Sequence, residues 1–189
     1  MNKKVPIVFI LGPSGAGKTT LAKDLESGLN FIHLDIDRAD GQDGIDVENL
    51  RSEWNEYLRS NQAQRLANVI HQRTAGENKR GAILSFPSGL VLTDEHIREG
   101  TEHGIVTVIL YGPRQDCINS FLEREKTTSR HLGINHWERN NRESYALFGL
   151  PEFAPYRILT FENGNRIPST SLIEDVRLRV ADIGKYAAA

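Results

Sequence analysis

A glycine-rich segment near the start of the chain carries residue types that bind phosphate groups. Residues 12–19 read Gly-Pro-Ser-Gly-Ala-Gly-Lys-Thr and match the pattern G-x-x-x-x-G-K-[ST] at every position. Glycines let such a loop curl so that successive N–H groups point at a polyphosphate. A helix that follows adds unpaired donors and the positive end of its dipole. The pattern predicts a binding loop for a nucleoside triphosphate.

Two side chains of this loop have separate predicted roles. Lys18 would reach the β- and γ-phosphates, and the hydroxyl of Thr19 would bind Mg²⁺. The alternative is a glycine-rich turn that caps an ordinary helix, and the apolar run before the loop and the helix-forming stretch after it argue against that. The residues predicted to bind ATP are Gly12, Ser14, Gly15, Ala16, Gly17, Lys18, Thr19 and Thr20.

Two carboxylates follow the second apolar run of the chain. Asp35 and Asp37 stand two residues apart, so in an extended segment both point the same way. At the carboxyl end of a parallel strand they share an edge with the phosphate loop. One could hold Mg²⁺ through water, and the other could accept a proton from an attacking hydroxyl. The alternative is a polar turn whose aspartates form local hydrogen bonds.

The elements that must position these residues are strands separated by helices. Continuous apolar runs, without strict alternation, indicate strands buried on both faces of a parallel sheet. Such runs occur at 5–11, 31–34, 82–86, 105–111 and 157–161. Helical patterns are predicted at 46–59, 62–75, 94–102 and about 115–126, with a last helix capped at Ser171 through a Ser171–Glu174 capping box. The pattern predicts one α/β domain over residues 1–189.

Composition excludes several classes of partner. The chain has 23 Lys and Arg against 25 Asp and Glu, a net charge of −2, so no basic field favours nucleic acid or an anionic membrane. A single cysteine, Cys117, excludes an internal disulfide and is expected to be a small core residue. No segment is long and apolar enough to span a membrane. We therefore expect a cytoplasmic protein, and, since no exposed heptad or long apolar stripe demands a dimer, a monomer.

The order of these motifs resembles that of the small-molecule kinases related to shikimate kinase and gluconate kinase. A phosphate loop, a second strand that ends in Asp-x-Asp, a helical segment and a loop after the third strand cover most of the chain. The resemblance implies a three-layer fold with a five-stranded parallel sheet in the order 2-3-1-4-5. It also implies that Asp35 lies near the metal and that Asp37 contacts the substrate hydroxyl, within a substrate-binding segment of about 35–75.

The resemblance extends to a lid over about 124–136. Arg124 and Arg130 match spaced arginines that clamp the triphosphate, although His131 replaces the usual proline. A solvated, charged helix end is the alternative for these arginines. Arg139 is the nearest match to an arginine that binds a substrate carboxylate, with Arg142 as the second choice.

After the third strand this chain departs from shikimate kinases. Ser88 and Gly89 could still line the acceptor pocket, although Phe86 and Pro87 replace part of a triple glycine. Arg51 stands near the position of a possible substrate arginine, and an ordinary amphipathic helix explains it slightly better.

The predicted function is Mg²⁺-dependent transfer of the ATP γ-phosphoryl group to a hydroxyl of a small polar or anionic metabolite. The predicted catalytic residues are Lys18, Asp37, Arg124 and Arg130. One alternative is a nucleotide or antibiotic kinase, for which Trp54 and Tyr57 could stack on a base. Another is a nucleotide-binding regulator or slow ATPase without an acceptor. GTPase motifs N-K-x-D and D-x-x-G do not occur.

Overall fold

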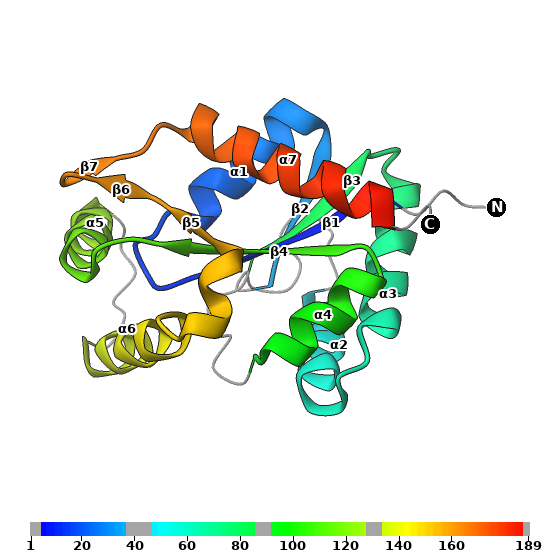
Figure 1. Ribbon diagram of the computed structural model, residues 1–189, viewed down its shortest axis with the longest axis horizontal. Helices are drawn as coiled ribbons and strands as arrows, with labels where there is room; N and C mark the ends of the chain where they lie inside the picture. Colours follow the sequence, from blue (N-terminus) through cyan, green and yellow to red (C-terminus); the bar gives the residue numbers. More distant parts are fainter. Residues whose placement is uncertain (1–4, 37–46, 86–91, 128–133, 187–189) are drawn as a thin grey trace.

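The computed structural model describes residues 5–36, 47–85, 92–127 and 134–186, and its centre is a five-stranded parallel sheet (Figure 1). The spatial order is β2-β3-β1-β4-β5, which confirms the predicted fold class and strand order. The register aligns Asp35 of β2 with Ser85 of β3, and Ser85 with Ile10 of β1. The strands are β1 (Ile7–Leu11), β2 (Phe31–Asp35), β3 (Gly81–Ser85), β4 (Ile105–Tyr111) and β5 (Arg157–Leu159).

Helices cover both faces of the sheet. Figure 1 shows α1 and α7 on one face and α2, α3, α4 and α6 on the other. The helices are α1 (Lys18–Leu29), α2 (Val47–Ser60), α3 (Ala63–Gly76), α4 (Asp94–Glu102), α5 (Arg114–Thr127), α6 (Ile134–Phe148) and α7 (Ser169–Tyr186), with a 3₁₀-helix, η2, at Pro151–Tyr156.

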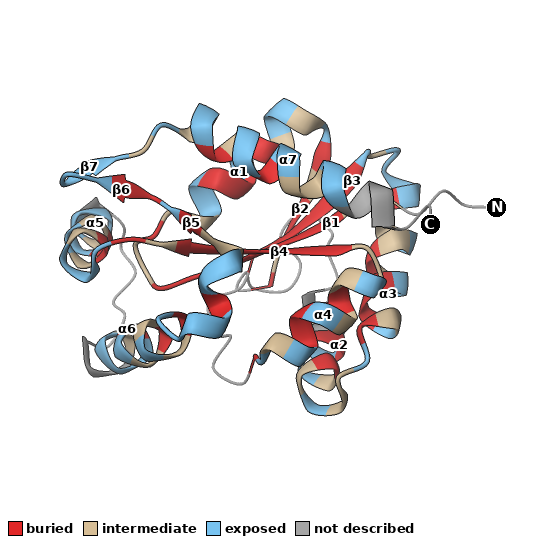
Figure 2. Cartoon of the chain, viewed as in Figure 1, coloured by how far each residue is buried: buried red, intermediate tan, exposed pale blue. Residues whose placement is uncertain are grey.

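Side chains of the central strand β1 belong to both hydrophobic cores, one on each face of the sheet. Its residues alternate between the two faces, so Ile7, Phe9 and Leu11 join the core under α2, α3, α4 and α6. Val8 and Ile10 join the core under α1, α5 and α7. Figure 2 shows this buried layer between the helices. All five residues of β1 are buried, as the continuous apolar run predicted.

Trp54 and Tyr57 of α2 belong to the first core. Each is only 1% exposed, and their rings lie 5.2 and 6.2 Å from the ring of Phe9. A base-binding role for these two aromatic residues, left open by the sequence, therefore loses its support. They hold α2 against the sheet instead.

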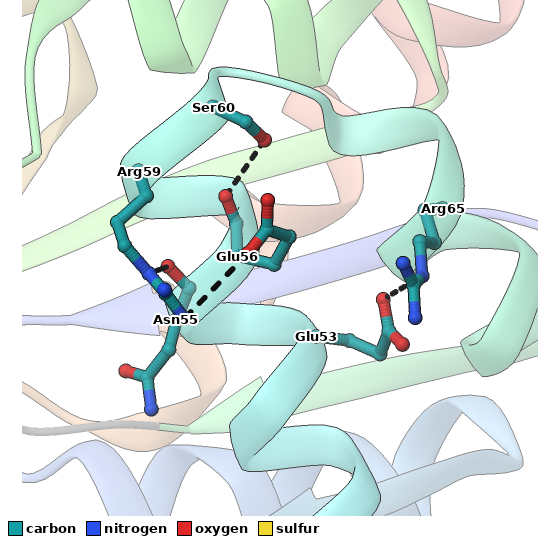
Figure 3. Close-up of polar contacts among 6 residues, drawn as sticks. All are labelled: Glu53, Asn55, Glu56, Arg59, Ser60 and Arg65. Atoms are coloured by element: carbon teal, nitrogen blue, oxygen red, sulfur yellow. Dashed lines mark hydrogen bonds and ion pairs between the residues drawn. The ribbon is translucent and has the colours of Figure 1, made fainter.

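Polar side chains link α2 to α3 and form contacts within the last turns of α2 (Figure 3). Arg65 of α3 pairs with the buried Glu53 of α2, with 2.7 Å between Nε and Oε2. At the end of α2, Arg59 pairs with Glu56 at 3.5 Å, and Ser60 donates to the Glu56 carbonyl. This ion pair, between the buried Glu53 and the exposed Arg65, links the two helices that lie between β2 and β3 in the chain.

The C-terminal region differs from its prediction in two ways. The run 157–161 is interrupted: β5 ends at Leu159, and β6 (Phe161–Glu162) pairs antiparallel with β7 (Asn165–Arg166). Asn163 and Gly164 turn this hairpin, with φ of 50° and 75°. Both central residues of a type I′ turn need a positive φ, which Asn-Gly adopts readily.

The predicted capping box of the last helix is also wrong. Helix α7 begins at Ser169, so Ser171 lies inside its first turn. The backbone N–H of Ser171 donates to the carbonyl of Pro168 at 3.1 Å. The N–H of Leu172 also donates to the Pro168 carbonyl, at 3.4 Å, so the first hydrogen bonds of the helix go to Pro168 and the helix starts ahead of the Ser171–Glu174 pattern.

Tyr57 makes the free energy of unfolding sensitive to alkaline pH. Its hydroxyl donates to the His96 carbonyl at 2.5 Å, and burial, with the charge of Glu99, raises its pKa well above the ordinary value. Above about pH 10 the unfolded chain ionises this tyrosine while the folded chain keeps it neutral, so stability falls as pH rises. Urea unfolding between pH 9 and 11 should show a shallower decline for Tyr57→Phe. Equal declines would show that Tyr57 titrates alike in both states.

Candidate active site

The phosphate loop joins the end of β1 to the start of α1, as the sequence predicted. Gly12, Gly15 and Gly17 all have positive φ, at 137°, 80° and 97°. Gly15 approaches α5 so closely that an added Cβ would overlap the carbonyl oxygen of Cys117. The loop therefore has a backbone shape and a close contact that only glycine permits at this position.

The first turn of α1 is suited to bind an anion. Lys18 begins the helix, and no acidic residue lies in its first turn to neutralise the positive end of the dipole. The Lys18 ammonium donates to the carbonyls of Gly12 and Pro13, at 2.7 and 2.9 Å. Thr19 and Thr20 are exposed. The two exposed threonines thus lie in the first turn of α1, and the Lys18 ammonium lies against the carbonyls of the loop before it.

Asp35 lies at the same edge of the sheet as the start of the phosphate loop. It ends β2, opposite Ser85, and alternation puts it on the same face as Phe31. Phe31 packs in the core that contains Leu21 and Leu25 of α1, so Asp35 lies on the α1 side of the sheet. This is the side from which a carboxylate could assist a metal bound to phosphates and to Thr19.

A buried polar contact supports the ends of β2 and β3. His33 Nε2 lies 2.8 Å from the hydroxyl of Ser85, and both residues are buried. His33 shares the strand face of Asp35, two residues before it. The sequence had indicated no role for this histidine, because its partner stands 52 residues away.

Arg51 reaches this edge from α2. Its Nε donates to the Ile36 carbonyl at 2.6 Å, so the guanidinium lies just beyond the end of β2. The sequence slightly favoured an ordinary helix position. The residue does belong to a helix, and its side chain nevertheless extends to the end of the strand that carries Asp35.

Arg166 is a site residue that the sequence analysis missed. It lies on β7, and its Nη2 donates to the Gly15 carbonyl of the phosphate loop at 3.1 Å and also bonds the Ser120 hydroxyl. Its guanidinium carbon lies 4.8 Å from the centroid of the Phe161 ring. The Asn163-Gly164 turn that folds this arginine onto the loop was the available signal.

The remaining predicted site residues divide into two groups. Arg124, on the last turn of α5, pairs with Glu125 at 3.0 Å, and Arg139, on α6, lies 4.0 Å from Glu143. Both side chains are exposed, and their roles stay predictions. The other group, Asp37, Ser88, Gly89 and Arg130, lies outside the described residues.

Cys117 is buried, as predicted, and burial raises the pKa of its thiol. A neutral, buried thiol packs as a small apolar side chain. In the described ranges no group of three or more His, Cys, Asp or Glu side chains could hold a metal by itself. None of the helices that the structure describes is long and apolar enough to cross a membrane.

Known proteins resemble this chain in sequence and in fold. No family model matches it. Shikimate kinase of Actinobacillus pleuropneumoniae serotype 5b is 25% identical over 172 residues, which cover 88% of this chain and 93% of that protein. Shikimate kinase of Marinomonas sp. is 26% identical over 131 residues, 68% of this chain and 67% of that protein.

A solved structure shares the fold. A sugar kinase from Janibacter sp. superposes with a TM-score of 0.55 at 19% identity, covering 98% of this chain and 99% of that one. This likeness agrees with the observed strand order. As its motif order predicted, the chain resembles, in sequence and in fold, the group of P-loop small-molecule kinases that includes shikimate kinase.

Proposed function

We propose that this protein transfers the γ-phosphoryl group of ATP, with Mg²⁺, to a hydroxyl group of a small polar or anionic metabolite. The observation that carries the proposal is the juxtaposition at one edge of the sheet. The phosphate loop follows β1 there, Asp35 ends β2 there, and Arg51 reaches the same place from α2. A nucleotide site and an acceptor site thus adjoin.

The residues of the loop would bind the nucleotide. Lys18 and the N–H groups of the loop would hold the β- and γ-phosphates, and Arg166 lies against the loop where it can add positive charge. Oxygen donors suit Mg²⁺, which proteins hold through one or two side chains plus the substrate phosphates. Thr19 and Asp35 fit that pattern. The ion would neutralise phosphate charge.

The acceptor side would supply a base and an anion-binding group. The acceptor oxygen forms a bond to the γ-phosphorus, the bond to the ADP oxygen breaks, and Asp37 takes the hydroxyl proton. Arg124 and Arg130 would close over the transferred group. Arg51, Ser88, Gly89 and Arg139 would bind the acceptor. An arginine at the end of β2 favours an acceptor with a carboxylate or phosphate.

A screen for ADP release tests this proposal. The curated relatives are named shikimate kinases, so shikimate is the first acceptor to test, followed by gluconate, other hydroxylated acids and nucleoside monophosphates. We expect one hydroxylated metabolite to raise ADP release above the basal rate. Asp37→Asn should then lower the stimulated rate by about 10²- to 10⁴-fold, because a general base is lost.

Asp175→Asn is the matched control, since Asp175 is exposed on α7. It should keep the stimulated rate. If no metabolite stimulated ADP release and Asp37→Asn left the basal ATPase unchanged, the chain would instead be a nucleotide-binding regulator or a slow ATPase. The burial of Trp54 and Tyr57 already disfavours the base-stacking form of a nucleotide kinase.

A further inference from the structure

A cavity of about 460 Å³ lies between α5 and α6. Cavities of this size hold small organic ligands. Ile118, Leu122 and Trp137 give it apolar walls, and its remaining described lining residues are Arg114, Glu138, Asn141 and Arg142. None of these residues belongs to the phosphate loop or to the end of β2.

The buried wall of this cavity contains a polar side chain without a partner. Asn141 is 1% exposed, and neither its amide nitrogen nor its amide oxygen has a hydrogen-bond partner within the described structure. Buried polar groups are nearly always satisfied, and an exception calls for an unmodelled water, ion or ligand. The amide atoms are buried, and Arg142, a further lining residue, is exposed.

The other lining groups define what would satisfy Asn141. Its amide offers one donor group and one acceptor, so it is fully paired only by a ligand edge that carries an acceptor beside a donor. A fully ionised carboxylate or phosphate has only hydrogen-bond acceptors, so it would leave the oxygen of the Asn141 amide unpaired. The edges of adenine and uracil have the required pair. Trp137, whose ring packs beside Phe121 with 4.8 Å between the ring centroids, adds an aromatic side chain to the lining on which such a base could stack.

The charges of the cavity favour an anionic group on the same ligand. The lining carries two guanidinium groups, Arg114 and Arg142, and one carboxylate, Glu138. Neither arginine forms an ion pair with a carboxylate of the described part of the chain. Guanidinium groups bind phosphate through paired N–H donors. The cavity therefore combines a base-reading amide, an aromatic wall and phosphate-binding cations.

The face of α5 that lines the cavity is not the face that contacts the phosphate loop. Arg114, Ile118 and Leu122 follow at i, i+4 and i+8 and form one stripe. Cys117 and Ser120 lie on another face, where the Cys117 carbonyl meets Gly15 and the Ser120 hydroxyl meets Arg166. The cavity is therefore a second site on the flank of the nucleotide site. It stands independently of the proposed kinase reaction.

We propose that the cavity between α5 and α6 binds a nucleoside monophosphate, with the base on Asn141 and Trp137 and the phosphate on Arg114 and Arg142. Isothermal titration calorimetry with AMP and with UMP tests this, on the full chain saturated with Mg²⁺ and a non-hydrolysable ATP analogue. The analogue occupies the phosphate loop. We expect one of the two nucleotides to bind, and inorganic phosphate or the free nucleoside to bind at least about 10-fold more weakly, since each supplies only half of the contacts.

Two variants locate the binding. Asn141→Leu should weaken it by about 10- to 100-fold, the range for a paired contact to a base edge, while the Tm of the free protein stays level or rises because no hydrogen bond is lost. Arg142→Ala, at an exposed position, gives a second test that does not disturb the core. Arg177→Ala is its matched control, since Arg177 is an exposed arginine of α7 that does not line the cavity.

Four results would overturn the proposal. The first is that neither nucleotide binds, and the second is that binding occurs only without the ATP analogue. The third is that inorganic phosphate binds as tightly as the nucleotide. The fourth is that Asn141→Leu and Arg142→Ala bind the nucleotide like the unmodified protein. A sharp fall in Tm for Asn141→Leu with intact binding in Arg142→Ala would show that Asn141 is structural, held by an ordered water. The rate of phosphoryl transfer in these two variants tests the proposed kinase reaction and does not test nucleotide binding in the cavity.

Discussion

Replacing Lys18 by alanine is expected to lower the rate of phosphoryl transfer by about 10²- to 10³-fold, the typical cost of removing one group that stabilises developing charge. Lys18 is the cation at the start of α1, in a loop whose N–H groups face the predicted phosphates. Its loss removes a positive charge from the β- and γ-phosphates in the transition state. Steady-state ADP release with the acceptor found in the screen measures the effect on kcat.

The fold of this variant should change little. The bonds from Lys18 to the carbonyls of Gly12 and Pro13 are partly buried, and each contributes about 1 kcal/mol. Lys23→Ala, at an exposed position of the same helix, is the matched control and should keep the full rate. If Lys18→Ala retained the rate of the unmodified protein, the phosphate loop would not serve phosphoryl transfer.

The second large effect is expected at Gly15, where alanine should destabilise the protein by about 3 kcal/mol. The residue has φ of 80°, which strains an L-amino acid, and the new Cβ would overlap backbone atoms of Cys117 in α5. Strain at such a position and overpacking each cost about 1–3 kcal/mol. For a chain of this size, Tm should fall by about 6–12 °C. Activity should fall as well, because the loop that cradles the phosphates must shift.

Gly28→Ala is a control variant whose stability should change in the opposite direction. Gly28 lies in α1, its surroundings are open, and it needs no unusual backbone angle. Alanine in a helix is about 0.5–1 kcal/mol more favourable than glycine, so this variant should be slightly more stable. Thermal unfolding of both variants checks the pair. Equal changes in Tm would contradict the role assigned to the contact between Gly15 and α5.

Local patterns in the sequence predicted most of the fold. The five apolar runs predicted the five strands, the last of which ends at Leu159, because a parallel sheet covered on both faces buries its central strands, as it does all of β1 and β3. Helix α4 begins after Thr93, whose hydroxyl accepts from the His96 N–H, as its position before the helical pattern indicated. The start of α7 was missed because Pro168 competes with the Ser171–Glu174 pattern.

The site was predicted only where its residues are neighbours in sequence. The loop from Gly12 to Thr20 is recognisable because one local backbone shape, with its glycines, makes the phosphate cradle. The approach of Arg166 to Gly15 spans 151 residues, and that of Arg51 to Ile36 spans 15. The Asn163-Gly164 turn predicts the hairpin that carries Arg166, but no local pattern shows which loop an exposed arginine on a hairpin or a helix will meet.

By itself, then, the sequence determined the order of the elements and the glycine-rich loop from which phosphate binding is predicted, since both depend on short-range spacing and apolar periodicity. Tertiary structure alone decided which distant side chains meet. Packing of the hairpin against α5 brought Arg166 to the loop, and packing of α2 brought Arg51 to the end of β2. The approach of α5 and α6 enclosed the unpaired amide of Asn141. These tertiary contacts follow from how whole helices pack on the sheet. That packing depends on the burial of all side chains in both cores, and no single sequence motif sets it.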